Sequence, residues 1–243
     1  MNRQPLIVVG ASRGFGAATT KQLAADGHHV VAVARSADRL AALADSSDHI
    51  IPATGDGRDA ELAVELLARH DPAAILIGGG ATPHMAPLED HTWETLSLNW
   101  ENDVALVFTW LHTILNNPTD SLEHVVVLSS GAGLFGSPGS GGYAGSKATT
   151  RFLATSAADS AKRLGRDIKF TSVNPKLTSD TDTGKAAVAG YAVINGTDAD
   201  AALAEPPLFT AEHAGRHLAN VLTHPDDYPA SQYLLAEDDL HQI

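Results

Sequence analysis

The stretch LIVVGASRGFG, residues 6–16, decides the fold of this chain. Its four apolar residues have the length and composition of a strand covered on both faces, and glycines follow at positions 10, 14 and 16. Glycine permits a tight turn and a close approach of backbone to ligand, and a helix that starts here directs its positive end at an anion. The stretch therefore predicts a dinucleotide site. Its expected residues are Gly10, Ser12, Arg13, Gly14, Phe15 and Gly16.

The spacing of these glycines leaves an alternative open. It differs from the Gly-x-Gly-x-x-Gly fingerprint of dinucleotide sites, and Gly10, Ser12 and Gly14 also match the Gly-x-Ser-x-Gly elbow of serine hydrolases. That elbow needs an oxyanion loop from an earlier strand, but only nine residues precede Gly10. No histidine follows a predicted strand where a catalytic base is needed. Hydrolysis is kept only as an alternative.

Outward from this stretch, short apolar runs alternate with amphipathic segments. Strands are expected at 6–9, 30–34, 50–53, 74–77, 125–128, 168–173 and 232–235, and helices at 16–25, 37–43, 60–69, 92–115, 143–164 and 211–222. Alternation of this kind gives right-handed crossovers and a parallel sheet. We expect one α/β domain over residues 1–243, a Rossmann-type doubly wound parallel sheet of about seven strands with helices on both faces. Around residues 179–207 the pattern loosens into small, polar and proline residues, and the segment is interpreted as a substrate lid rather than a plain loop.

Composition narrows the function classes. The 243 residues carry a net charge of −13, which disfavours general binding to nucleic acid. Cysteine is absent, so disulfides, thiolate nucleophiles and sulfur-ligated zinc are excluded. No apolar run approaches the roughly 20 residues that span a bilayer, and the amino terminus runs directly into the first strand without room for a signal peptide. We expect a soluble, cytoplasmic protein with no membrane partner.

Arg35 follows the second predicted strand. An acidic residue there would hold the ribose 2′-hydroxyl of NAD, whereas an arginine suits the 2′-phosphate of NADP. Arg13 in the glycine-rich turn could face the same phosphate. Two solvated surface arginines are the alternative interpretation. Because the chain is acidic overall, the pair favours NADP(H).

A second constellation follows the fifth predicted strand, which ends in Ser129 and Ser130. Tyr143 and Lys147 open the next long helix at i and i+4, on one helical face. An ammonium at that position favours the tyrosinate, so the tyrosine can act as a general acid or base on a carbinol or carbonyl oxygen. Ser130 lies at the carboxyl end of a parallel strand, where ligands collect, and could hold the same oxygen.

Together these motifs resemble the short-chain dehydrogenase/reductase family, over the chain up to about Pro175. The resemblance implies hydride transfer between nicotinamide and a substrate carbon. It assigns Ser130 to orient the substrate oxygen, Tyr143 to protonate it, and Lys147 to bind the nicotinamide ribose and tune Tyr143. Asn99 matches the asparagine that supports a proton-relay water. The expected cofactor-binding residues are Gly10, Ser12, Arg13, Gly14, Phe15, Gly16, Arg35, Asp56, Gly57, Gly79, Gly80, Tyr143, Lys147 and Pro175.

The chain departs from the family pattern in three places. Residues 78–81 read Gly-Gly-Gly-Ala where the family usually has Asn-Asn-Ala-Gly, a loss of two side-chain amides that we expect to loosen the adenine side. Lys176 follows Pro175 where the family prefers glycine. The carboxyl terminus is acidic and lacks the family's Gly-Gly ending, so contacts between subunits there are open.

The sequence thus predicts an NADPH-dependent reductase of ketones or aldehydes, with Ser130, Tyr143, Lys147 and Asn99 as catalytic residues. Reduced cellular NADP pools favour that direction. The alternative is a non-catalytic NADP(H)-sensing protein on the same fold. The family implies a homodimer or homotetramer acting on a small carbonyl or alcohol. No metal is expected, since His213 and His217 lack a third ligand.

Overall fold

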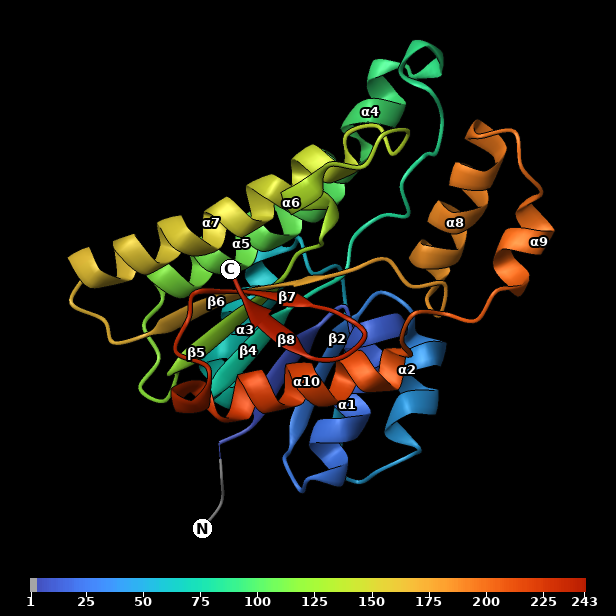
Figure 1. Cartoon of the computed structure of the whole chain (residues 1–243). Coiled ribbons are helices and arrows are strands. Elements are labelled where there is room, and N and C mark those ends of the chain that lie inside the picture. Colours follow the sequence, from blue (N-terminus) through green and yellow to red (C-terminus); the bar gives the residue numbers. More distant parts are fainter. Residues whose placement is uncertain (1–3) are drawn as a thin grey trace.

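The apolar runs form the strands of one sheet in a computed structural model that describes residues 4–243. The sheet order is β3-β2-β1-β4-β5-β6-β7-β8 (Figure 1). The first seven strands are parallel and β8 pairs antiparallel with β7 at the edge. Their bounds are β1 Leu6–Val9, β2 Val30–Ala34, β3 Ile50–Thr54, β4 Ala74–Ile77, β5 His124–Leu128, β6 Lys169–Pro175, β7 Gln232–Leu235 and β8 Leu240–Gln242.

The predicted fold class is confirmed, and the sheet has eight strands rather than seven. The additional strand, β8, is three residues long, and two of the three are polar, so it is too short for periodicity to reveal it. The described helical elements are α1 Gly14–Ala25, α2 Ala37–Ala44, α3 Ala60–His70, η1 Leu88–Asp90, α4 Trp93–Asn99, η2 Trp100–Val104, α5 Ala105–Asn116, α6 Ala132–Phe135, α7 Tyr143–Arg163, α8 Asp182–Ile194, α9 Ala199–Ala204, α10 Ala211–Thr223 and η3 Pro225–Asp227.

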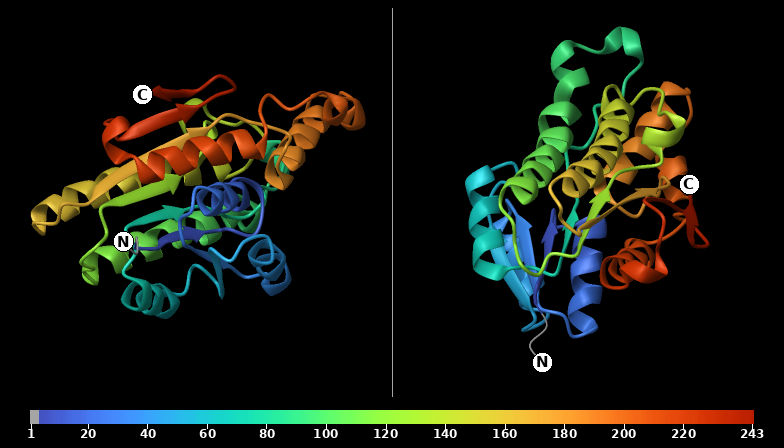
Figure 2. Two further views of the ribbon diagram at one scale, coloured as in Figure 1. Left: turned by 90° about the horizontal axis from the view of Figure 1, so that it is seen from below. Right: turned by 90° about the vertical axis from the view of Figure 1, so that its left-hand side faces the viewer.

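Helices cover both faces of the sheet, and the strands alternate between two cores. Leu6 and Val8 of β1 join a core with α1, α2 and α10, whereas Ile7 and Val9 join a core with α3, α5 and α7. Successive residues of a strand point to opposite faces, so a strand buried on both sides must be apolar throughout. Figure 2 shows the sheet between these two layers of helices.

The strand order reverses between β1 and β4, which are neighbours in the sheet. In open α/β sheets ligands bind at such a switch point, beyond the carboxyl ends of the strands. The helices α8 and α9 project on that side of the sheet (Figure 1). The fold therefore brings three segments together at the carboxyl ends of the central strands. They are the glycine-rich turn after β1, the glycines after β4 and the serines after β5.

The helix expected over residues 92–115 is divided. It consists of α4, a π-helical turn, η2, and α5. A π turn inserts an extra residue and changes which side chains face the protein interior. The apolar period on either side is preserved, which is why the sequence indicated one uninterrupted helix there.

Candidate active site

The turn after β1 is packed too tightly for side chains. Gly10 has a φ of +84°, and a Cβ on it would lie 2.5 Å from the carbonyl oxygen of Gly78. A Cβ on Gly16 would lie 2.2 Å from the carbonyl oxygen of Gly10. Arg13 is the N-cap of α1 and makes no side-chain capping hydrogen bond. The first N–H groups of α1 are therefore available to an anion.

A cavity of about 720 Å³ opens beside this turn, and it brings the sequence-predicted residues together. Of the predicted catalytic and cofactor-binding residues, Asn99 alone is not part of the lining. The cavity is lined by Gly10, Ser12, Arg13, Gly14, Phe15, Gly16, Arg35, Asp56, Gly57, Gly79, Gly80, Ser130, Tyr143, Lys147 and Pro175. Its size and residues fit a dinucleotide.

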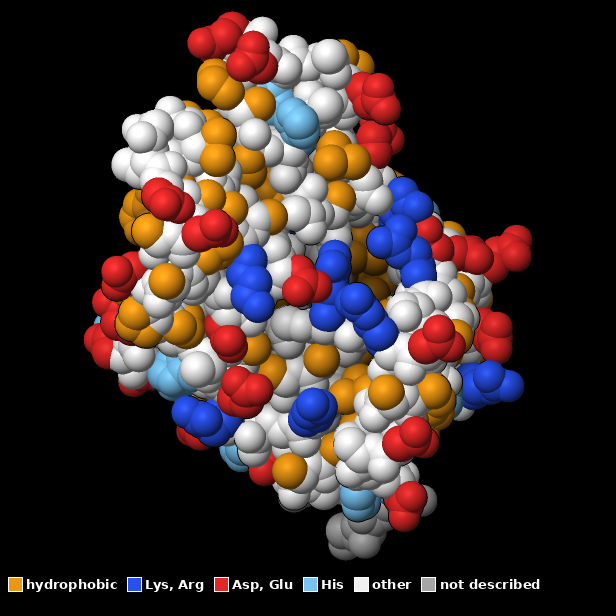
Figure 3. Space-filling view, turned by 90° about the vertical axis from the view of Figure 1, so that its right-hand side faces the viewer, with side chains coloured by type: hydrophobic (Ala, Val, Ile, Leu, Met, Phe, Trp, Pro, Cys, Tyr) orange, Lys and Arg blue, Asp and Glu red, His pale blue; other side chains and the backbone are white. Residues whose placement is uncertain are grey.

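Arginines surround one end of the cavity. Arg13, Arg35, Arg39 and Arg58 all line it, and all four are exposed. Figure 3 shows Lys and Arg side chains gathered around a hollow on this face of the molecule. Sequence reasoning identified Arg13 and Arg35 but missed the other two. Arg39 lies one helical turn beyond Arg35 in the chain, a spacing that could have pointed to it.

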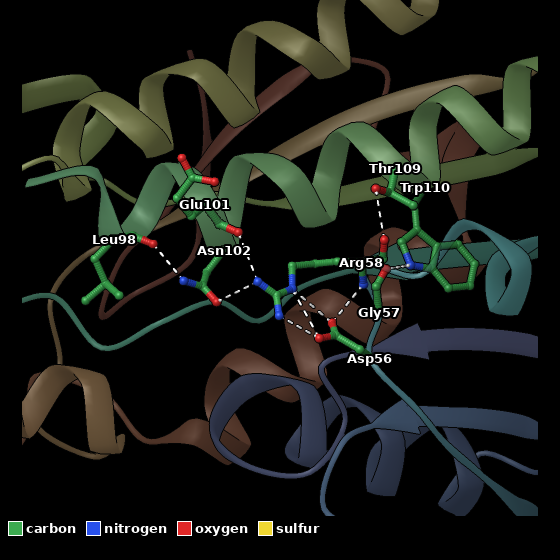
Figure 4. Close-up of polar contacts among 8 residues, drawn as sticks. All are labelled: Asp56, Gly57, Arg58, Leu98, Glu101, Asn102, Thr109 and Trp110. Atoms are coloured by element: carbon green, nitrogen blue, oxygen red, sulfur yellow. Dashed lines mark hydrogen bonds and ion pairs between the residues drawn. The ribbon is translucent and has the colours of Figure 1, made fainter. Parts of the chain in front are cut away.

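Arg58 ties the loop after β3 to the π-helical turn (Figure 4). Its guanidinium binds Asp56 in a bidentate pair, with Nη2 2.7 Å from Oδ2. Its Nη1 donates to the carbonyl oxygen of Glu101 at 3.1 Å and to Oδ1 of Asn102 at 3.3 Å. The hydrogen bond from Arg58 is the main cause that lowers the pKa of Asp56 to about 2. This end of the cavity is thus held by charge and hydrogen bonds at the surface.

The loop is also fixed from within. Trp110, fully buried in α5, donates from Nε1 to the carbonyl oxygen of Gly57 at 2.8 Å (Figure 4). A Cβ on Gly57 would come within 2.6 Å of Leu106. A side chain at position 57 would therefore require Leu106 to shift where this loop packs on α5.

Ser130, Tyr143 and Lys147 lie at the opposite end of the cavity. Ser130 follows β5, and its Oγ accepts a hydrogen bond from the backbone of Ala132 at 3.2 Å. Tyr143 starts α7, and Nζ of Lys147 lies 5.5 Å from the centre of its ring. The hydroxyl of Ser129 binds the carbonyl oxygen of Lys147 at 2.7 Å and so joins α7 to the end of β5.

Asp103 is a residue that sequence reasoning missed. Its Oδ2 lies 3.0 Å from Nζ of Lys147, and both side chains are buried. Burial disfavours the ammonium, but the charges of Asp103 and Tyr143 outweigh it and raise the pKa of Lys147. Asn99 lies behind this pair and donates to Ala81 O at 2.8 Å and to Asp103 Oδ1 at 3.3 Å. The spacing of four residues between Asn99 and Asp103 was the available signal.

Residues 179–207, expected to form a lid, contain α8 and α9 and contribute Thr181, Asp182 and Tyr191 to the cavity. Asp182 pairs with Arg13 at 3.2 Å, although both side chains are exposed. Tyr191 hydrogen-bonds to Ser137 in the loop after Ser130. The segment thus contacts the cavity at both ends, as a lid would, and its closure stays a prediction.

Pro175 also lines the cavity, and its carbonyl oxygen accepts a hydrogen bond from the backbone N–H of Gly131 at 2.8 Å.

Within residues 4–243 no cluster of three or more His, Asp or Glu side chains could hold a metal ion. None of the helices in that range has the length and hydropathy needed to cross a membrane.

Comparison with known proteins reveals related sequences. The family model described as short chain dehydrogenase matches residues 4–192. A probable NADP-dependent dehydrogenase of Haemophilus influenzae is 29% identical over 197 residues, which cover 75% of this chain and 74% of that protein. Carbonyl reductase (NADPH) 2 of Sus scrofa is 28% identical over 174 residues, 70% of each protein.

Among solved structures, an alcohol dehydrogenase from the archaeon Thermococcus sibiricus, complexed with 5-hydroxy-NADP, superposes with a TM-score of 0.75. The match covers 97% of both chains at 21% identity. At this level of identity the superposition establishes the fold.

Proposed function

Because the chain belongs to the short-chain dehydrogenase family, we propose that it is an NADP(H)-dependent oxidoreductase that reduces a ketone or aldehyde to an alcohol. One observation carries the proposal: a single cavity has exposed arginines at one end and Ser130, Tyr143 and Lys147 at the other. Arginines are suited to a phosphate, and the second group is suited to proton transfer. The related NADP-dependent dehydrogenase and NADPH-dependent carbonyl reductase support the same cofactor.

The residues present fit NADP(H). The backbone at Gly10 and Gly14 and the N-terminus of α1 would hold the pyrophosphate, because no side chain intervenes there. Arg35, with Arg13 or Arg39, would hold the 2′-phosphate, and Asp56–Gly57 would border the adenine. The bound cofactor supplies the hydride.

The chain's own residues would handle the proton. Ser130 would donate a hydrogen bond to the substrate carbonyl and orient it, and Tyr143 would transfer its phenolic proton to the oxygen as negative charge develops there. Lys147 would hold the nicotinamide ribose, and its ammonium would stabilise the tyrosinate left behind. Asn99 would act through its hydrogen bonds to Ala81 and Asp103, which keep the lysine's surroundings in place.

We further propose that the protein works in the cytoplasm as a homodimer or homotetramer. The helices α5 and α7 pack against each other (Figure 1). Their outer surfaces expose Phe108 and Phe152. Large apolar side chains that stay exposed on neighbouring helices are suited to a subunit contact.

The test is consumption of NADPH with a panel of aldehydes and ketones, followed by the absorbance of the reduced nicotinamide. Wild type should consume NADPH with at least one class of carbonyl. Tyr143→Phe fills the same space without the hydroxyl and should lower kcat by about 10²–10⁴-fold while NADPH still binds. Tight NADPH binding with no consumption across the panel, or full turnover in Tyr143→Phe, would contradict the proposed reaction.

A further inference from the structure

The lysine beside the proposed proton donor has a buried acidic partner, Asp103, that the proposed reaction does not use. We propose that Asp103 is a positioning residue: it fixes the Lys147 ammonium and offsets its charge, so that Tyr143 keeps its proton and can act as an acid. This inference rests on the proposed function. It identifies which groups control the proton and bias the site toward carbonyl reduction.

Asp103 is held by three contacts and is nearly inaccessible to solvent. Its Oδ1 accepts from the backbone of Ala81 at 2.9 Å and from Asn99 at 3.3 Å, while its Oδ2 lies 3.0 Å from Lys147 Nζ. One oxygen thus binds the segment after β4 and the other faces the lysine. A carboxylate restrained in this way can direct an ammonium, because it has little freedom of its own.

The backbone after β4 leaves room for this carboxylate. A Cβ on Gly80 would lie 2.4 Å from Asp103 Cγ and Oδ1, closer than such atoms approach in proteins. Gly80 also has a φ of +143°, which side-chain-bearing residues rarely adopt. The Asp103 carboxylate therefore fits here because position 80 has no side chain. The two residues lie 23 positions apart in the sequence.

The π-helical turn η2 presents Asp103 to α7. It packs on α7, and the residue before Asp103, Asn102, is anchored by a bond to Leu98 O at 2.8 Å and by Arg58 (Figure 4). π turns inside helices occur frequently at functional sites. The anchoring from the Arg58 side keeps the turn from relaxing and carrying Asp103 away from the lysine.

The charge balance around Lys147 gives the consequence. Asp103 from η2 and Tyr143 from α7 are the described groups whose charge acts on its ammonium. A lone ammonium beside a phenol promotes loss of the phenolic proton. A carboxylate 3.0 Å from that ammonium offsets its charge, and this offset is the effect that the proposal assigns to Asp103.

The experiment follows Tyr143 directly by NMR of protein labelled with ¹³C at the ring carbon that bears the hydroxyl. The chain has four tyrosines, so Tyr143→Phe identifies the Tyr143 signal by its loss. Wild type and Asp103→Asn are titrated from about pH 7 to pH 11, around the ordinary tyrosine range. In Asp103→Asn the signal should reach the tyrosinate position about one pH unit lower than in wild type.

Matched variants separate charge from structure. Glu101→Gln removes a negative charge from the same turn at an exposed position and should leave the Tyr143 titration unchanged. Asp103→Glu keeps the charge and should titrate close to wild type. If circular dichroism finds Asp103→Asn unfolded, Asp103→Ser removes the charge and leaves space for water. The proposal is overturned if Tyr143 titrates alike in wild type and in the folded neutral variant.

The NMR comparison needs neither NADPH nor a substrate. A wild type that consumes no NADPH with any carbonyl would refute the proposed reaction, whatever the titrations give. Identical titrations in a protein with full turnover would refute only the role of Asp103. Where turnover is found, kcat can be measured in both directions at one fixed pH with saturating substrate and cofactor. The ratio of kcat for alcohol oxidation to kcat for carbonyl reduction should rise in Asp103→Asn, since tyrosinate is the form that accepts a proton.

Discussion

Two ion pairs stand at the two ends of the cavity, and they differ mainly in their exposure to water. Asp56 and Arg58 lie 2.7 Å apart with both side chains 38% exposed, whereas Asp103 and Lys147 lie 3.0 Å apart and are 1% and 7% exposed. The same pairing of acid and base is therefore surrounded by water at one end and by protein at the other.

The difference suits the two ends to different tasks. An exposed pair contributes little to the free energy of unfolding, because water screens its charges and its side chains lose freedom on pairing. Arg35 and Arg39, which are exposed and line the same cavity, can turn toward a phosphate at small cost. A buried pair interacts strongly, and loss of either partner leaves an unpaired charge away from water. We therefore expect the exposed end to select the cofactor and the buried end to carry the proposed proton transfer.

The largest effect is expected from a substitution that breaks the buried pair. Asp103→Ala should lower the free energy of unfolding by about 3 kcal/mol, because Lys147 loses its partner in a buried setting. Asp56→Ala, the matched change in the exposed pair, should lower it by less than about 1 kcal/mol. Urea denaturation of the two variants at neutral pH measures both values. Equal losses would mean that exposure does not distinguish the pairs.

A smaller effect tests whether the exposed end selects the cofactor. Arg35→Ala should weaken NADPH binding about tenfold or more, the value of a charge-assisted hydrogen bond, while NADH binding changes little. Isothermal titration with both cofactors measures the two affinities. Arg69→Ala is the control, since Arg69 is exposed, pairs with Glu65 and does not line the cavity. An unchanged preference for NADPH in Arg35→Ala would remove Arg35 from this role.

The elements that the sequence predicted best are those whose pattern is local. Runs such as Val30–Ala34 are apolar on both faces because helices cover both sides of the sheet, so composition alone identified them. Tyr143 and Lys147 share a helical face by spacing alone. The glycine turn was recognised because a strand and a helix flank it directly.

What the sequence could not reveal depends on contacts between distant segments. The π turn interrupts the helix at Trp100–Val104, and Asp103 within it is buried, which no local pattern reports. An acid in an amphipathic helix is ordinarily a surface residue, so the four-residue spacing from Asn99 was a weak signal for Asp103. Gly80 likewise acquires its meaning only beside Asp103, 23 positions later in the chain. The catalytic and cofactor roles themselves stay predictions until the variants are measured.

The smallest expected effect is the loss of stability when low pH protonates Asp56 in the exposed pair. The hydrogen bond from Arg58 lowers the pKa of Asp56 from 3.8 to about 2. The ionised carboxylate is thus favoured in the folded state, so its stabilisation is fully present above pH 3.8 and is lost as the pH falls through about 2. Because both side chains are well exposed, the loss should stay below about 1 kcal/mol. Urea denaturation of wild type and Asp56→Asn, at pH values above and below 3.8, measures the difference in their free energies of unfolding. This difference should shrink at the lower pH. A difference that grows instead would mean that the pair is more strongly coupled to the fold than its exposure implies.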